Sequence, residues 1–192
     1  AVADDITQFA PPLRDEPMRK HTSWRVGGPA DLFFKPASVP ELQRVLAELP
    51  PGTPVHWLGL GSNVLVRDGG IRGAVIATSG LPKELVRIDD VRVRAGAGLA
   101  CMQLAKQCMR WQLGPAAFFA GIPGTVGGAL AMNAGAFGGE AWNHVETVLT
   151  IDRSGIVRTR PRGDFAISYR TVSGPVEWFL EGTFHLEHDA AS

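Results

Sequence analysis

The stretch from Ala120 to Glu140, AGIPGTVGGALAMNAGAFGGE, constrains this chain more than any other. It holds seven glycines between Gly121 and Gly139, with four alanines among them. Such a run makes a poor core, because glycine brings no side chain to bury and costs backbone entropy to fix. Glycine does let backbone N–H groups come close to a ligand, and it permits turns that other residues resist. We therefore interpret the run as a cradle for a large, flat, phosphate-bearing cofactor.

Composition limits the classes of partner. At 192 residues the chain can hold one large domain or two small ones, and an apolar fraction of 45% is enough for a real core. The formal net charge is zero, which argues against a nucleic-acid or membrane surface held by bulk charge. Fifteen of the 19 basic residues are arginine, which favours an anionic ligand, although codon usage in a GC-rich genome explains the excess equally well. We expect a monomer that binds a small molecule.

Cysteine and histidine usage gives no metal site. Cys101 and Cys108 lie seven residues apart in a helical pattern, without a CxxC motif, and are interpreted as buried thiols. The five histidines are scattered and show no HxxxH spacing. We see no signal peptide and no apolar run near 18 residues, so we expect a cytoplasmic protein.

The periodicity predicts an α+β protein with two sub-domains. Residues 1–20 are polar and rich in proline, and are expected to form a flexible N-terminal arm. Residues 21–79 follow as a β-α-β-β sub-domain, and residues 80–188 as a second sub-domain. Ser38 and Glu41 form a capping box that opens the first helix. The expected strands are 31–36, 55–58, 64–66, 74–77, 85–89, 91–95, 144–152, 156–159 and 176–186, and the expected helices are 38–49, 99–113 (with Gly114 as the C-terminal cap) and 127–132.

Two loops are candidates for phosphate binding. Gly59-Leu-Gly-Ser-Asn63 directly follows a predicted strand and could form a concave nest of N–H groups, although a plain structural turn is the default interpretation of an isolated pentapeptide. In the longer run, the helix that starts at Thr125 could point its dipole toward phosphate, and Asn133 offers an amide to ring heteroatoms. The alternative is a seam of tight helix packing. Two such loops, in two sub-domains, suggest a nucleotide held between them.

Tyr169-Arg170 is the remaining candidate pair. An arginine beside a tyrosine, between two loops, suits a contact to an anion or the stabilisation of an oxyanion. A surface pair without function is the default interpretation of such a dipeptide.

Five segments in order resemble one enzyme family. They are HTSWRVGGPA (21–30), GLGSNVLVRDGG (59–70), GAG (96–98), GIPGTVGGALAMNAGA (121–136) and SYR (168–170). From His21 to Leu186, the chain is similar to the UDP-N-acetylenolpyruvoylglucosamine reductases, also called UDP-N-acetylmuramate dehydrogenases, of bacterial cell-wall synthesis. The resemblance implies the two-sub-domain FAD-binding fold of the vanillyl-alcohol-oxidase type, with FAD between the sub-domains and NADPH as the reductant.

The resemblance also implies roles for individual residues. It makes Arg170 catalytic, through stabilisation of the enolate-like charge that follows hydride addition to an enolpyruvyl group. It places Tyr169 on the substrate side. The implied cofactor-binding residues are Gly59, Gly61, Ser62, Asn63, Ile122, Pro123, Gly124, Thr125, Gly127, Gly128 and Asn133.

The sequence departs from the family pattern in its length. The family continues into a substrate-binding domain that carries a serine proton donor and a later glutamate, and neither motif occurs in this sequence. We therefore expect FAD binding with very slow turnover or none, since losing a general acid costs about 10²–10⁴-fold in rate. The alternatives are another flavin oxidoreductase of the same fold, or a non-catalytic module that binds FAD or a nucleotide.

Overall fold

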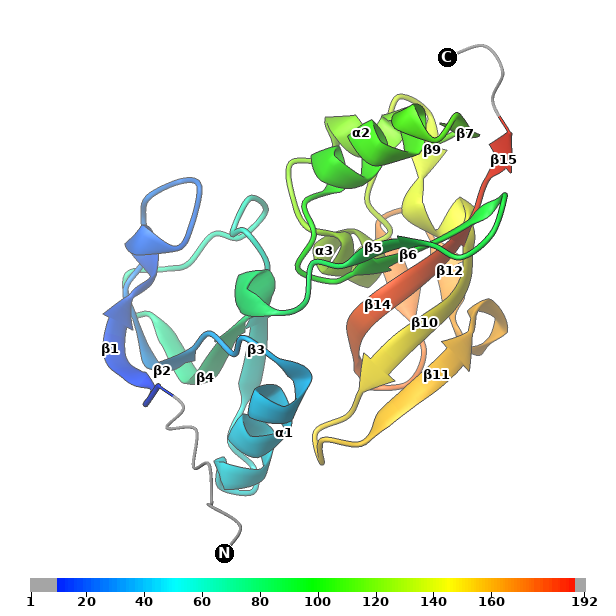
Figure 1. The fold of residues 1–192 in the computed structure, drawn as a ribbon. Helices are drawn as coiled ribbons and strands as arrows, with labels where there is room; N and C mark the ends of the chain where they lie inside the picture. Colours follow the sequence, from blue (N-terminus) through cyan, green and yellow to red (C-terminus); the bar gives the residue numbers. More distant parts are fainter. Residues whose placement is uncertain (1–9, 189–192) are drawn as a thin grey trace, which may run out of the picture.

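A four-stranded sheet builds the first lobe (residues 10–80) of the computed structural model, which describes residues 10–188 (Figure 1). Its strand order is β1-β2-β4-β3; β1 runs antiparallel to β2, and β4 runs parallel to both β2 and β3. Helix α1 (Val39–Glu48) makes the crossover from β2 to β3. The strands are β1 (Leu13–Pro17), β2 (Pro29–Phe34), β3 (Val55–Leu58) and β4 (Ile71–Ala77).

The predicted capping box of α1 is confirmed. The Ser38 hydroxyl accepts a hydrogen bond from the Glu41 N–H at 3.2 Å, and the Glu41 carboxylate accepts one from the Ala37 N–H at 2.7 Å. The first bond satisfies a backbone donor that a helix start leaves unpaired, and the second holds the residue before the N-cap, so the helix begins where the sequence predicts.

A five-stranded antiparallel sheet builds the second lobe (residues 81–188). Its order is β11-β10-β14-β6-β5, and α2 (Cys101–Arg110) and α3 (Val126–Ala131) belong to the same lobe (Figure 1). The strands are β5 (Leu85–Arg87), β6 (Arg92–Gly96), β10 (Val145–Ile151), β11 (Val157–Pro161) and β14 (Trp178–His185). Three short pairs complete it: β7 (Leu113–Gly114) with β15 (Glu187–His188), β8 (Gly135–Ala136) with β9 (Gly139–Glu140), and β12 (Ala166–Ser168) with β13 (Thr171–Ser173). Short 3-10 turns lie at Met18–Lys20, Thr78–Gly80, Ala117–Gly121, Ala141–Asn143 and Arg162–Asp164.

The two lobes share a core and polar contacts. Leu46 of α1 and Ile76 of β4 belong to the same buried cluster as Ile151 and Leu180 of the second sheet. The Arg153 guanidinium donates to the Leu46 carbonyl at 2.7 Å, and so binds the end of α1 from the other lobe. The relative placement of the lobes is therefore fixed by apolar burial and by a bonded helix end.

The structure corrects three expectations. The expected arm is wrong from Leu13 onward, because Leu13–Pro17 pairs with β2 and the Met18 side chain is fully buried; residues 1–9 lie outside the described residues. Residues 64–66 are irregular, because this segment follows the loop that ends β3 and no strand pairs with it in the described range. Helix α2 ends at Arg110, three residues before the predicted end, and the left-handed residue after it is Gln112 (φ 55°). The predicted cap Gly114 is instead paired with Glu187 in the β7–β15 ladder.

The chain passes from the first sheet to the second near the sub-domain boundary that the sequence predicts. The last strand of the first sheet ends at Ala77, and the second sheet begins at Leu85. Cys101 and Cys108 are fully buried, as expected, and burial raises the pKa of each thiol to about 12. Over residues 10–188, no helix is long and apolar enough to cross a membrane, and no group of three or more metal-binding side chains forms.

Candidate functional site

A cavity of about 660 Å³ lies where two glycine-rich loops from the two lobes meet. We call residues 59–64 the first loop and residues 121–125 the second loop. The cavity also reaches α3 and the Tyr169-Arg170 turn. Of the residues predicted from the sequence, it is lined by Gly59, Gly61, Ser62, Asn63, Ile122, Pro123, Gly124, Thr125, Gly128 and Arg170.

The first loop continues from the end of β3 and is held by the segment after β1. Gly61 has a φ of 68°, and a Cβ atom there would lie 2.0 Å from the His21 carbonyl oxygen. The Ser23 N–H donates to the Gly61 carbonyl at 3.0 Å. Only glycine satisfies both the left-handed backbone and this close approach. The structure thus explains why the HTS motif and the GLGSN motif occur together.

Backbone donors of the first loop remain available to a ligand. In the part of the chain that the structure describes, the N–H groups of residues 60–63 donate to no protein acceptor. Unpaired N–H groups that line a cavity favour an anion, because an unsatisfied donor is costly and a phosphate oxygen satisfies it. The loop therefore has the chemistry of a phosphate site.

The second loop and the start of α3 are held by residues 97–101, which begin within the GAG motif. The Gly124 carbonyl accepts from the Cys101 N–H at 2.9 Å, and the Gly127 N–H donates to the Ala97 carbonyl at 3.0 Å. A Cβ atom at Gly127 would lie 2.9 Å from the Ala97 Cβ, so this glycine serves close packing. Gly127 accordingly lies outside the large cavity and lines a neighbouring pocket.

The first N–H groups of α3 are bonded within the protein. The Val126 N–H donates to the Leu99 carbonyl at 2.8 Å, the Gly127 N–H is bonded to Ala97, and the Gly128 N–H donates to the Thr125 hydroxyl at 3.3 Å. Protein acceptors therefore occupy the first N–H groups of this helix, so none of these groups is open to bond a phosphate directly, and the alignment of the helix dipole with a phosphate stays a prediction. Thr125 acts as the helix cap.

The loops approach each other across the lobes. A Cβ atom at Gly59 would lie 3.0 Å from the Thr125 hydroxyl, and one at Gly124 would lie 3.5 Å from the Ser62 hydroxyl. The absence of side chains at these two glycines lets the two loops approach each other closely. A ligand in the cavity would contact both lobes.

Arg170 lies at the turn between β12 and β13. Its backbone has a φ of 54°, its Nη2 donates to the Gly135 carbonyl at 3.1 Å, and its Cζ lies 5.7 Å from the centre of the Tyr169 ring. The guanidinium therefore has a fixed partner and still lines the cavity. Tyr169 is 78% exposed and does not line it.

Asn133 is placed differently from the prediction. It is buried, and its side-chain amide donates to the Glu140 carboxylate at 2.9 Å and to the Ser168 carbonyl at 3.2 Å. Its amide oxygen accepts from the Trp142 N–H at 3.1 Å. The predicted contact to ring heteroatoms is not supported, because Asn133 is bonded to protein and does not line the cavity.

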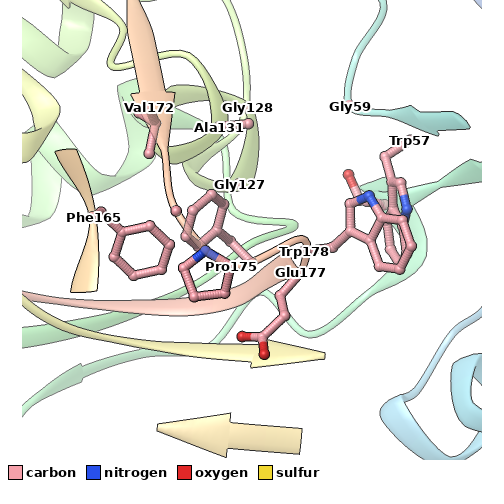
Figure 2. A pocket seen from close by; sticks show the side chains of 13 residues that line it. Trp57, Gly59, Gly127, Gly128, Ala131, Phe165, Val172, Pro175, Glu177 and Trp178 are labelled. Atoms are coloured by element: carbon pink, nitrogen blue, oxygen red, sulfur yellow. The ribbon is translucent and has the colours of Figure 1, made fainter. Parts of the chain in front are cut away.

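Sequence reasoning missed an aromatic pocket of about 210 Å³ that adjoins the cavity (Figure 2). Trp57 and Trp178, one from each lobe, stack with ring centres 4.6 Å apart and an interplanar angle of 28°. The two cavities share Trp57, Gly59, Gly128 and Ala131 as lining residues. Trp57 Nε1 is buried and has no hydrogen-bond partner among the described residues. The sequence signal for this pocket was Trp57 itself, which lies two residues before the first loop.

The buried Glu177 carboxylate beside this pocket is neutralised by arginine side chains. The Glu177 side chain is only 6% exposed, accepts from Arg160 Nη2 at 2.6 Å, and accepts from the Thr150 hydroxyl at 2.7 Å. The bond from Arg160 is the main reason that the pKa of Glu177 is lowered. Glu177 is thus an ionised structural group.

Comparisons with known proteins agree with this geometry. A family model described as an FAD binding domain matches residues 30–160. The chain is 53% identical to the UDP-N-acetylenolpyruvoylglucosamine reductase of Alkalilimnicola ehrlichii, over 90% of this chain and 58% of that protein. It is 50% identical to the enzyme of that name from Methylococcus capsulatus, over 91% of this chain and 58% of that protein.

A solved structure gives the same result. The crystal structure of UDP-N-acetylenolpyruvylglucosamine reductase (MurB) from Thermus caldophilus matches with a TM-score of 0.75 at 29% identity, and the match covers 90% of this chain and 61% of that one. The chain thus spans about three fifths of the length of these relatives. Because the family model covers most of the chain and both loops that build the cavity, the chain belongs to the FAD binding domain family.

Proposed function

We propose that this chain is the FAD-binding part of an NADPH-dependent reductase. The substrate would be UDP-N-acetylglucosamine enolpyruvate, reduced to UDP-N-acetylmuramate in peptidoglycan synthesis. The names of relatives at 50–53% identity support this assignment. The observation that carries it is the cavity of about 660 Å³ between two glycine-rich loops, where the N–H groups of residues 60–63 have no acceptor among the described residues.

The residues of the cavity fit FAD. The N–H groups of residues 60–63 and the side chains of Ser62 and Asn63 would hold the pyrophosphate. Gly124 and Gly128 present open backbone, against which a planar group can lie. When bound, FAD supplies hydride transfer, and the protein supplies its orientation and the surrounding charge.

Arg170 is the candidate catalytic residue. Its bond to the Gly135 carbonyl fixes a positive charge at the cavity before any ligand arrives. A fixed guanidinium stabilises negative charge that develops beside it without reorganisation at the moment of reaction. This role suits an enolate-like charge next to a carboxylate.

The first experiment is optical. The purified chain, incubated with FAD and passed through a desalting column, should retain yellow flavin that denaturation releases. If the chain stays colourless and takes up no FAD, the proposal fails at its first step. Flavin that survives acid denaturation on the protein would instead favour an oxidase with covalently attached FAD.

The second experiment separates a reductase from a binding module. Under anaerobic conditions, NADPH should bleach the flavin absorbance of the loaded chain, and Arg170→Met should retain FAD. Flavin that binds but is never reduced by NADPH would support a non-catalytic FAD-binding module.

A further inference from the structure

Asn133 is a buried polar side chain that the proposed cofactor site does not use. It is 1% exposed, follows α3, and has a φ of 44°. Its amide makes three hydrogen bonds, to Glu140, Ser168 and Trp142. Both amide protons and the amide oxygen therefore have hydrogen-bond partners within the protein.

One of these bonds holds the base of the turn that carries Arg170. Ser168 and Thr171 form the last pair of the β12–β13 hairpin, so Tyr169 and Arg170 alone make the connection. Arg170 has a φ of 54°, a left-handed backbone that is unfavourable for a residue with a Cβ atom. Such a turn needs support from its surroundings, and the bond from Asn133 to the Ser168 carbonyl supplies it.

The same segment also fixes the side chain of Arg170. The Gly135 carbonyl, two residues after Asn133, accepts from Arg170 Nη2 at 3.1 Å. Gly135 is itself held in the short β8–β9 pair, in which Glu140 is its register partner. Residues 133–135 thus bond once to Ser168, at the base of the hairpin that carries Arg170, and once to the Arg170 guanidinium.

We propose that Asn133 is a positioning residue that holds Arg170 at the cavity. This inference rests on the proposed function only for the task of Arg170. The position of the hairpin can be tested without FAD. An amide is required because one side of Asn133 faces two acceptors and the other faces a donor. An aspartate would lose both donors and would place its charge beside Glu140.

The test uses the whole chain and two substitutions. Asn133→Gly removes the side chain and suits a φ of 44°, so backbone strain falls while the three bonds are lost. Asn133→Asp keeps the shape and removes the donors. Glu140→Gln is the matched control, because its amide oxygen can still accept the bond from Asn133. Circular dichroism and thermal unfolding establish that each variant folds.

Hydrogen exchange is the readout that does not need FAD. We expect amide exchange within residues 168–171 to be about tenfold faster or more in Asn133→Gly and Asn133→Asp, with exchange in α2 unchanged. Glu140→Gln should match the unsubstituted chain. Equal exchange of residues 168–171 in all four proteins would overturn the inference.

The functional readout is a double-mutant cycle with Arg170→Met. Asn133→Gly should slow the reoxidation of reduced flavin by UDP-N-acetylglucosamine enolpyruvate, which is the step in which Arg170 would act, while FAD affinity stays within about threefold, because the first loop is untouched. The double substitution should be no slower than Arg170→Met alone. Additive losses would contradict a role through Arg170. If even the unsubstituted chain binds no FAD, the proposed function fails, and the exchange data still decide whether Asn133 positions the hairpin.

Discussion

Replacing Gly61 by alanine would put a Cβ atom 2.0 Å from the His21 carbonyl oxygen and 2.9 Å from the Thr22 Cα atom. Both obstacles are backbone, so rotation of a side chain cannot relieve them. The φ of 68° adds a penalty of about 1–2 kcal/mol for a residue with a Cβ atom. Displacement of the loop also breaks the bond from the Ser23 N–H to the Gly61 carbonyl, worth about 1 kcal/mol.

We therefore expect Gly61→Ala to lower the free energy of unfolding by about 2–3 kcal/mol. At about 2–4 °C per kcal/mol, the melting temperature should fall by roughly 4–12 °C. Gly61→Ala should also weaken FAD binding, because the N–H groups of residues 60–63 move. This loss of affinity is a separate effect from the loss of stability. Loss of one hydrogen bond to a charged phosphate, about 1.5–3 kcal/mol, weakens binding roughly 10- to 150-fold.

Two other glycines provide matched controls. Gly52 has a φ of 81°, and beyond its chain neighbours no atom of residues 10–188 lies within 4 Å of an added Cβ, so Gly52→Ala measures the backbone penalty alone. Gly69 has open space and no left-handed φ, so Gly69→Ala should leave stability and FAD affinity unchanged. Thermal unfolding and FAD fluorescence titration of the three variants are the assays. A Gly61→Ala chain that unfolds and binds FAD like Gly69→Ala would refute this account of the first loop.

Two further predictions concern contacts outside the cavity. The pKa of Glu177 is lowered below 4.5, chiefly by its bond from Arg160, so its contribution is complete above about 4.5 and is lost as the pH falls through the lower folded value. Urea unfolding against pH should thus show a steeper acid loss in the unsubstituted chain than in Glu177→Gln; parallel curves would contradict it. Arg153→Met removes donors to the carbonyls of Leu46, Leu49 and Pro50 and should cost about 1–2 kcal/mol. The urea midpoint of Arg153→Met should fall while the slope of the transition stays constant, and the midpoint of Arg153→Lys should lie between those of Arg153→Met and the unsubstituted chain. An unchanged midpoint in Arg153→Met would show that this bond does not hold the lobes together.

Local signals placed most of the fold correctly. The capping box at Ser38, the Val55–Leu58 strand and the hairpin around Arg153 depend on neighbouring residues, so sequence patterns capture them. The strand at Leu13–Pro17 was missed because proline-rich polar residues resemble an arm, and its pairing with β2 depends on a partner distant in sequence.

The candidate site divides in the same way. The glycine patterns indicated where backbone would approach a ligand, and the structure brings both loops to one cavity. The Trp57–Trp178 stack could not be predicted, because the two rings come from different lobes and 121 positions of sequence separate them. Asn133 looked like a ligand contact because a sequence does not show which amides are already bonded.

By itself, the sequence determined the α+β class, the two glycine-rich loops and the family resemblance, since each depends on residue type and local spacing. Only the tertiary structure decided which N–H groups stay unpaired. Those of residues 60–63 find no acceptor within residues 10–188, while those at the start of α3 are bonded to Leu99, Ala97 and Thr125. The physical reason is that a hydrogen bond between distant segments depends on how the lobes and loops pack, and a short motif carries no record of that packing.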